Sequence, residues 1–338
     1  MQAAVSVFRD RTNLLACIPQ WEELAAHAIE ANPLYEHWML LPALERLAPG
    51  EGFRCVLAWV EDASGARKLG ALLPLHAPGW YKGLPIPVLR SFRHGGWSLC
   101  TPLVRAGCAR PCLQALLDWF SDEGEASLLE LSHFPRDGAL YREMARLLHE
   151  REQMALATDR IMCARLRRQP DAGAFPPPTM AGPILHRTME PGEDAQPWIR
   201  AYVELGADER GVLLPALADA HRRGRLLMSG IDYGGRPIAR SAAIVAGAAA
   251  FALPTACDAG YAQCAPQAMA EAQLARHFLR QPALRTLDSL SGAESGLLYR
   301  LWGGARLFQS LLIGDGSWGD VAVAVTSAHD DVALWTTP

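Results

Sequence analysis

The sequence lacks several patterns by which common protein classes are identified. Its eight cysteines are scattered and include no CxxC pair, so neither a zinc site nor a disulfide framework is expected, and free, mostly buried thiols are predicted. The histidines form no HxxxH, HxH or HExxH pattern, and no metal site is expected. The absence of a Walker loop, a GxGxxG motif and a GxSxG motif argues against kinases, dehydrogenases and hydrolases.

Long hydrophobic runs are also missing. The longest apolar run, Ser241–Leu253, is shorter than the roughly 20 residues that a membrane-spanning helix needs, and it is bounded by Arg240 and Pro254. The first residues, MQAAVSVFRDRTN, lack the apolar core of a signal peptide. No membrane insertion is therefore expected, and the predicted location is the cytoplasm.

The composition is that of a globular protein with enough apolar residues for a large core. Half of the 338 residues are hydrophobic and 20% are charged, so a disordered chain is not expected. The net charge of −4 does not favour nucleic acid or an anionic membrane as an obligatory partner. At this length two lobes are expected.

The boundary between the two lobes is predicted at a proline-rich stretch. Residues 169–183 include three consecutive prolines, which form a stiff, extended connector. The predicted lobes are therefore residues 1–168 and 184–338. Both contain a helix led by tryptophan (Trp21, Trp198), a second helix and a hairpin, which indicates an internal repeat, although chance similarity between two α/β halves is an alternative.

The second half contains a regular order of elements from Gly224 to Gln281. Glycines between apolar runs predict an antiparallel meander, because tight hairpin turns need positive φ. A helix then starts at Pro266, with apolar residues every four positions. The strands are predicted at 226–231, 237–245 and 248–253, and a further edge strand is predicted near the C-terminus at Val321–Val325.

The start of the helix at Pro266 has the properties of an anion site. The first N–H groups of a helix have no internal partners, and Ala265, at the expected cap position, has no side-chain acceptor. Free N–H groups and the helix dipole together suit a phosphate. The alternative is a weakly capped helix that is hydrated by solvent.

The runs DYGGRPIA, ACDAGYAQCAPQAMAEAQLARHF and LDSLSGAESGLLYRLWGGAR, in this order, resemble the GNAT acyltransferase superfamily. Within it, the sequence is most similar to the CelD/BcsL-like branch, which is named for its association with cellulose synthesis. The chain departs from the pattern at Ala265 and Gln267, where relatives often carry Ser and Gly, and at Leu290, where they often have Cys. Matching positions are Asp232–Ala239, Asp258–Tyr261, Pro266, Asp288, Ser289, Leu301, Trp302 and Arg306.

The resemblance implies an α/β (α+β) fold of two tandem GNAT-like lobes, each a mixed, mostly antiparallel sheet flanked by helices. It implies an N-acyltransferase with acyl-CoA, such as acetyl-CoA, as co-substrate and no metal. In this fold the acyl-CoA lies where two strands diverge, with its pyrophosphate on the helix that follows. The donor-binding residues implied in the C-terminal lobe are Ala265, Gln267, Ala268 and Met269.

Three residues are expected to be catalytic. Asp258 could orient or deprotonate an amine, Tyr261 could protonate the leaving thiolate, and Asp288 could serve as a base or bind a cation. The structural alternatives are a turn aspartate, a packed tyrosine and a turn at Asp288.

Five residues are expected to bind the acceptor substrate. His94 and Trp97 lie in a glycine-containing loop of the first lobe, although a lone loop histidine is more often a surface residue. Ser289 and Glu294 follow Asp288, with a turn and a helix start as the alternative reading. Arg306 could bind a carboxylate or phosphate, or it could pair structurally with Asp288, which we prefer slightly.

The sequence therefore predicts an N-acyltransferase that acts on a small-molecule amine by direct attack, because no activated Cys or Ser arrangement is visible. One alternative is a Fem-like transferase that takes its acyl group from aminoacyl-tRNA, which the departures at Ala265 and Gln267 favour and the acidic balance disfavours. Another is a non-catalytic GNAT-like scaffold in a biosynthetic complex.

Overall fold

The computed structural model describes residues 2–47, 52–95, 97–123, 125–168, 183–207, 213–291, 296–316 and 318–330. The chain divides into two compact units. The N-terminal unit contains residues 1–161 and 307–338, and the C-terminal unit contains residues 162–306. The predicted linker at 169–183 lies outside the described residues except for Pro183.

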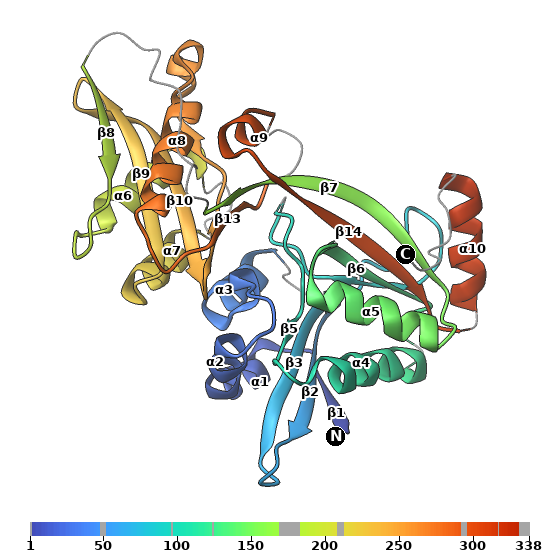
Figure 1. Ribbon diagram of the computed structural model, residues 1–338. Helices are drawn as coiled ribbons and strands as arrows, with labels where there is room; N and C mark the ends of the chain where they lie inside the picture. The colour runs from blue at the N-terminus through green and yellow to red at the C-terminus, as the bar shows by residue number, and fades with distance from the viewer. Residues whose placement is uncertain are drawn as a thin grey trace. The chain divides into compact units, whose positions relative to one another are not determined.

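The sheet of the N-terminal unit has the strand order β1-β2-β3-β4-β6-β14, with β5 also paired to β3 (Figure 1). β4 and β6 run parallel, whereas β1, β2 and β3 are antiparallel neighbours. The strands are β1 (Ala3–Phe8), β2 (Phe53–Glu61), β3 (Arg67–His76), β4 (Val88–Ser91), β5 (Leu103–Val104), β6 (Leu128–Pro135) and β14 (Ala305–Gly314). The helices are α1 (Arg11–Leu15), α2 (Ile18–Ala26), η1 (Pro33–Tyr35), α3 (His37–Leu47), α4 (Ala109–Glu123), α5 (Ala139–Glu150) and α10 (Trp318–Asp330).

The alternation of side chains along β6 and β14 divides the core of this unit into two layers. Leu129 and Leu131 pack in one cluster with the apolar faces of α4 and α5. Leu128 points to the other face, where it packs with Leu312 of β14 and Val323 of α10. Successive residues of a strand point to opposite faces, so both sides of the sheet are covered.

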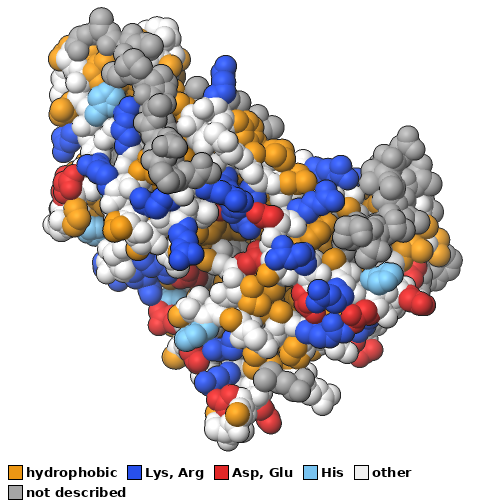
Figure 2. All heavy atoms as spheres, in the orientation of Figure 1, with side chains coloured by type: hydrophobic (Ala, Val, Ile, Leu, Met, Phe, Trp, Pro, Cys, Tyr) orange, Lys and Arg blue, Asp and Glu red, His pale blue; other side chains and the backbone are white. Residues whose placement is uncertain are grey.

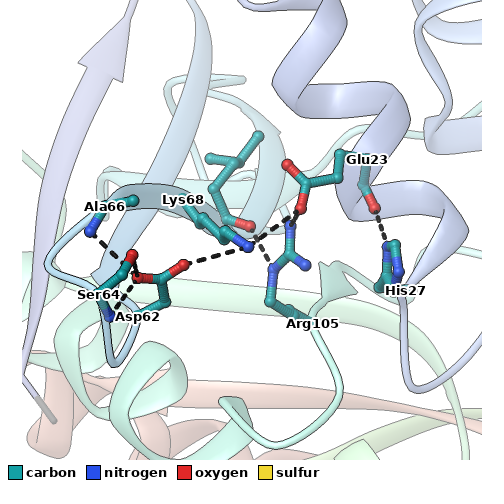
Figure 3. A network of polar contacts seen from close by, with 8 residues as sticks. Glu23, His27, Asp62, Ser64, Ala66, Lys68 and Arg105 are labelled. Carbon is teal, nitrogen blue, oxygen red and sulfur yellow. Dashed lines mark hydrogen bonds and ion pairs between the residues drawn. The ribbon is translucent and has the colours of Figure 1, made fainter.

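A network of charged groups links the β2–β3 hairpin to α2 (Figure 3). In the hairpin turn, Asp62 accepts hydrogen bonds from the backbone and hydroxyl of Ser64, which hold the pKa of Asp62 well below its usual range. Lys68 lies 3.2 Å from Asp62 and 3.8 Å from Glu23 of α2, which Arg105 also approaches to 3.2 Å. These pairings join the hairpin turn, α2 and Arg105 through ion pairs between partly exposed groups.

In the C-terminal unit the sheet has the strand order β7-β13-β11-β10-β9-β8 (Figure 1). β11 and β13 run parallel, whereas β10, β9 and β8 are antiparallel neighbours. The strands are β7 (Ala155–Arg167), β8 (Ile184–Thr188), β9 (Leu226–Tyr233), β10 (Arg236–Ala246), β11 (Ala249–Ala252), β12 (Ala256–Cys257) and β13 (Thr286–Ser289). The helices are α6 (Gln196–Tyr202), η2 (Val203–Ala207), α7 (Leu213–Arg222), η3 (Ala259–Cys264), α8 (Pro266–Leu279) and α9 (Gly296–Trp302).

Helix α8 covers one face of this sheet. Its residues Leu274 and Phe278 pack in one cluster with Leu287 of β13 and with Leu298 and Trp302 of α9. Ala243 of β10 belongs to the same cluster. Arg240, three positions earlier on β10, points to the opposite face, where its guanidinium lies over the Trp198 ring of α6. This sheet also has helices on both faces, and the predicted mixed, mostly antiparallel architecture flanked by helices is confirmed in each unit.

The structure confirms the predicted meander and helix of the second half. Strands β9, β10 and β11 and helix α8 begin within two residues of their predicted starts. The predicted edge strand at Val321–Val325 is wrong, because this segment belongs to helix α10. Val323 is fully buried whereas Val321 is 51% exposed, a pattern that a helix gives and that a strand, with both residues on one face, does not.

The two compact units of the structure differ from the predicted lobes in two places. Strand β7 continues past residue 161 into the C-terminal unit, where Arg167 is paired with Thr286 of β13. Residues 307–338, predicted to belong to the second lobe, lie in the N-terminal unit, where β14 pairs antiparallel with β6. A strand adds to whichever sheet edge offers free N–H and C=O groups, regardless of sequence distance.

All eight cysteines are free, and six of them are buried, as predicted. Within the described ranges, no helix is both long and apolar enough to cross a membrane. Over the same ranges, no cluster of three His, Cys, Asp or Glu side chains is arranged to hold a metal ion.

Candidate active site

The ladder between the parallel strands β11 and β13 ends next to a bulge of the chain against β10. The pairing Ala243↔Ala252 is followed by Arg240↔Ala256, so three residues, 253–255, stand opposite two on β10. Pro254 in this bulge has no N–H to donate and cannot continue the ladder. The ladder between β11 and β13 accordingly stops at Ala252 and Ser289.

A cavity of about 190 Å³ occupies this position. It is bounded by the bulge, by the end of β13, by the first three turns of α8 and by α9. The lining residues are Ala252, Leu253, Pro254, Thr255, Gln267, Glu271, Leu274, Ser289, Ser291, Leu298 and Trp302. All belong to the C-terminal unit.

Glu271 is the ionisable group of this cavity, and its side chain is almost fully buried. Its Oε1 accepts a hydrogen bond of 2.9 Å from Gln267 Nε2, and its Oε2 has no partner. Burial raises the pKa of Glu271 to about 7, against the smaller opposing effects of the neighbouring Gln267 and Thr255 side chains. Near neutral pH this carboxylate is therefore able both to take up and to release a proton.

Two further polar groups line the cavity. The indole Nε1 of Trp302 is buried and has no hydrogen-bond partner. The hydroxyl of Ser289 donates to the carbonyl oxygen of Ser291 at 3.2 Å. Two residues that line the cavity thus each carry a buried polar atom without a hydrogen-bond partner, the donor Trp302 Nε1 and the acceptor Glu271 Oε2.

The four residues expected to bind the donor lie around the start of α8. Ala265 adopts left-handed backbone angles, and no side chain caps the helix. Gln267 lines the cavity, whereas the side chain of Met269 is buried in a cluster with Ile231 and Ile238. Ala268, partly exposed, lies in the first turn between them. The first turn is therefore free of side-chain caps, as the sequence predicts.

Asp258 and Tyr261 lie just before α8 and are not among the residues that line the cavity. Asp258 accepts a hydrogen bond of 2.9 Å from the backbone N–H of Gly260 and caps η3. Tyr261 packs against the ring of Tyr233, with 5.7 Å between ring centroids. These contacts are those of the structural alternatives, and the catalytic roles of both residues stay predictions.

Asp288 points away from α8, because its neighbours Leu287 and Ser289 face the helix and the cavity. Its carboxylate is bound by Arg165, with Nε to Oδ1 at 2.5 Å and Nη2 to Oδ2 at 2.9 Å. Arg306 lies 3.5 Å from the same carboxylate. We infer that Asp288 and Arg306 form a buried ion-pair cluster, which leaves Asp288 poorly placed for the base role that the sequence suggested.

Two further predicted residues, His94 and Trp97, are not among the residues that line the cavity. His94 and Trp97 lie in the N-terminal unit, where their rings stack in parallel with centroids 5.9 Å apart. His94 is buried, which lowers its pKa to about 4. Glu294 lies outside the described residues.

Sequence reasoning missed Glu271. The residue lies on the stripe of α8 that contains Leu274 and Phe278, since positions 271, 274 and 278 follow helical spacing. A carboxylate in phase with buried apolar residues of an amphipathic helix is the signal that could have found it, because an unpaired buried acid is costly unless it has a function.

No family model and no curated protein matches this sequence. Solved structures do resemble it, and they include GNAT proteins. FemX is 10% identical, with 94% of this chain and 100% of that chain covered and a TM-score of 0.58. The C-terminal domain of a putative lysylphosphatidylglycerol synthetase from Agrobacterium fabrum is 9% identical, with 93% and 96% covered and a TM-score of 0.51.

A tandem GNAT protein from the clavulanic acid biosynthesis pathway is also similar over most of its length. It is 14% identical, covers 93% of this chain and 99% of its own, and has a TM-score of 0.49. At such low identities the similarities concern the fold alone. The fold is shared with FemX and with the lysylphosphatidylglycerol synthetase domain, and what it does in this chain has to be argued from its own residues.

Proposed function

We propose that this protein is an N-acyltransferase whose reaction takes place in the cavity between β11 and β13. The observation that carries the proposal is the Glu271 carboxyl group, buried in the cavity with one unpaired oxygen. The GNAT-like fold supports it, as do the motifs in 232–306 that resemble the CelD/BcsL-like branch. That branch stays a prediction, as do the cytoplasmic location and the small-molecule amine acceptor.

In the proposed mechanism Glu271 is the general base. An amine must lose a proton to attack a thioester, and a carboxylate with a pKa of about 7 accepts one near neutral pH. The new C–N bond forms as the C–S bond breaks, and Glu271 returns the proton to the departing thiolate. Trp302 Nε1, a buried donor without a partner, would hydrogen-bond to the oxygen that gains negative charge.

The donor we propose is an acyl-CoA. The uncapped first turn of α8 supports this choice, because its N–H groups have no side-chain acceptor and suit a phosphate. The cavity, with a volume of about 190 Å³, has room for a small acyl group, such as acetyl, next to Glu271. Ala265, Gln267 and Ala268 would bind the pyrophosphate through their backbone.

Thermal unfolding with and without millimolar CoA or acetyl-CoA tests the donor. A ligand at about 100 times its Kd stabilises the folded state by roughly 2.7 kcal/mol, which moves the midpoint by several degrees. A shift with either compound supports an acyl-CoA donor and justifies a screen of amines. An unchanged midpoint at saturating concentrations would exclude CoA.

Replacing Glu271 by Gln tests the base. The variant keeps the shape and the hydrogen bond from Gln267 but cannot accept a proton. We expect kcat to fall about 100-fold or more, and the wild-type rate to rise with pH through about 7. The control is Glu204→Gln, an exposed residue of η2, which should leave kcat unchanged. Equal rates for the two variants would remove Glu271 from the mechanism.

An aminoacyl-tRNA donor is the second candidate, and the charge of the C-terminal unit favours it. Residues 162–306 contain 16 arginines, no lysine and 13 acidic residues, a net charge of +3 in a chain whose total is −4. On the face shown in Figure 2, however, Lys and Arg side chains lie among acidic and apolar ones. Such a distribution suits weak attraction to a polyanion rather than a dedicated binding groove.

Retention of RNA distinguishes the two donors. A protein that neutralises several phosphates loses affinity steeply as salt rises. Binding of tRNA at 50 mM salt that disappears by 300 mM, together with no response to CoA, would favour the tRNA donor. A response to CoA without RNA binding would favour the acyl-CoA donor.

A further inference from the structure

Strand β1 forms one edge of the sheet in the N-terminal unit. Within the described residues β1 pairs only with β2, so its other edge presents N–H and C=O groups without ladder partners (Figure 1). Natural edge strands are usually protected by a charged residue, a proline or a bulge. Residues 3–8, AAVSVF, include no charge and no proline, and their register with β2 is uninterrupted. This edge therefore has the properties of one that accepts a further strand.

A groove of about 900 Å³ lies against this strand, between β1 and α4. β1 contributes Ala3 and Val5, which pack on the core cluster that contains the apolar residues of α4. On α4 the lining positions are 111, 114, 115, 118, 119 and 122, which is the spacing of one face of a helix. The groove is thus lined by the edge strand on one side and by a single helix face on the other.

The charged residues of the groove are mostly acidic. The lining contains three carboxylates and one guanidinium, a net charge of −2, from Asp118, Asp122, Glu125 and Arg9. Arg9 forms an ion pair with Glu125. Asp118 is bound by Arg151 at 2.5 Å, whereas Asp122 is exposed and has no ion pair within the described part of the chain. The groove therefore keeps an acidic group that is available to a cation.

The N-terminal unit as a whole has the same sign of charge. Residues 162–306 carry +3 of the chain's total of −4, which leaves a net charge of −7 on the N-terminal unit. Opposite charges steer association and like charges oppose it, so a basic partner fits this groove. Pairing of β1 with β1 of a second copy would bring two acidic units together, which disfavours that arrangement.

The groove also has a buried donor. Trp119 lines it and is only 9% exposed, and its indole Nε1 has no hydrogen-bond partner among the described residues. Buried donors are nearly always paired in native proteins, so this atom indicates an acceptor that a bound molecule supplies. A peptide carbonyl is such an acceptor, and a peptide is also the ligand whose main chain can continue the ladder of an edge strand.

We propose that the groove between β1 and α4 binds an extended peptide segment with basic residues at alternate positions, which adds to β1 as a further strand. Successive side chains of a strand point to opposite faces, so every second one lies on the side of α4, with Asp118 and Asp122. Main-chain hydrogen bonds to β1 supply affinity, and the acidic residues select the charge. The site shares no residue with the Glu271 cavity and does not depend on the function proposed for that cavity.

Fluorescence anisotropy with labelled peptides tests the groove in the full-length protein. The probe is acetyl-KVKVKVKV-amide, in which lysine occupies every second position. We expect it to bind saturably and at least tenfold more tightly than acetyl-KKVVKKVV-amide, which has the same composition, and than spermine, which has a similar charge and no peptide groups. Equal binding of either control would overturn strand addition.

Hydrogen exchange shows whether the peptide pairs with β1. The probe should slow the exchange of amide protons in residues 3–8, because those that face the free edge gain an acceptor. Binding of the probe without any such protection would place the peptide elsewhere and overturn the proposal.

Two double variants of equal charge complete the test. Asp118→Asn with Asp122→Asn should weaken binding of the probe at least tenfold. Asp137→Asn with Asp159→Asn removes two exposed carboxylates of the same unit outside the groove and should leave binding unchanged. Equal binding by the two variants, or no saturable binding up to about 1 mM probe, would overturn the site. A dimer in light scattering that the probe dissociates would assign the edge of β1 to a second copy instead.

Discussion

At the scale of single residues, Glu271 links the candidate site to the stability of the fold. Its pKa in the folded protein is about 7, above the value near 4.3 of an exposed glutamate. Between these two values the folded state holds a proton that the unfolded state has lost. Stability from this group is therefore present below about pH 4 and is lost as the pH rises through 7.

Glu271→Gln should remove that dependence. We expect the free energy of unfolding of the variant, minus that of the wild type, to increase by roughly 3 kcal/mol between pH 4 and pH 8, since each pKa unit corresponds to about 1.4 kcal/mol. Urea unfolding at several pH values measures this difference, in which the other titrating groups cancel. A constant difference would mean that Glu271 is not buried as an acid.

Asp288 is expected to matter for stability rather than for turnover. Replacing it by Asn leaves the guanidiniums of Arg165 and Arg306 without their shared carboxylate, and removing one partner of a buried ion pair costs about 3–5 kcal/mol. Asp258→Ala, which removes only a cap, should cost about 1 kcal/mol. Chemical unfolding gives both values, and a kcat per folded molecule that falls in Asp288→Asn would restore the base role.

The candidate site was only partly predictable at this scale. Local signals indicate three features of the site. Pro254 lies in the bulge, Pro266 marks the start of α8, and the order of the motifs indicates Ser289. The ion pair of Asp288 and the burial of Glu271 did not follow, since they depend on which face each side chain takes and on Arg165, which lies 123 positions away from Asp288. Sequence patterns alone do not show such distant partners.

At the scale of elements, α10 shows how tertiary packing can outweigh local preference. Valines at 321, 323 and 325 alternate with alanines, a pattern that favours a strand. The segment is nevertheless helical, and Ala322 and Val323 pack against Tyr81 and Leu312. The three meander strands were predicted well because their turns at Gly234, Gly235 and Gly247 have the positive φ that their glycines indicate.

Two alanine substitutions distinguish a helix from a strand at this position. Val323→Ala should cost about 1–2 kcal/mol, because it removes two buried methyl groups, whereas Val321→Ala should cost at most about 0.5 kcal/mol. In a strand both residues would share one face and the two costs would be similar. Guanidinium unfolding of the pair checks this, and equal losses would contradict the helix.

At the scale of the whole molecule, the N-terminal unit is not continuous in sequence. Its sheet includes β14, whose Leu311, Leu312 and Ile313 are fully buried in its two core clusters. The approximate repeat and the proline-rich stretch predicted two successive lobes, because both signals are local. Neither shows that residues after 306 return to the first unit.

A fragment comparison tests this arrangement. Residues 1–168 alone should lack cooperative unfolding and tend to aggregate, because β6 would expose an unpaired edge and apolar residues. Joining residues 305–338 to the same fragment through a glycine-rich linker should restore a cooperative transition. Differential scanning calorimetry of the two fragments measures the difference, and a cooperative transition in the shorter one would contradict the expectation.

The position of β14 also sets the order in which the protein can be assembled during translation. At about 5–20 residues per second, the ribosome needs on the order of ten seconds to proceed from the end of β7 to β14. For that time the nascent N-terminal unit has no partner for one edge of β6, while the C-terminal unit is already being synthesised. The first unit to emerge is therefore the last to be completed, and we expect it to be the part that chaperones protect.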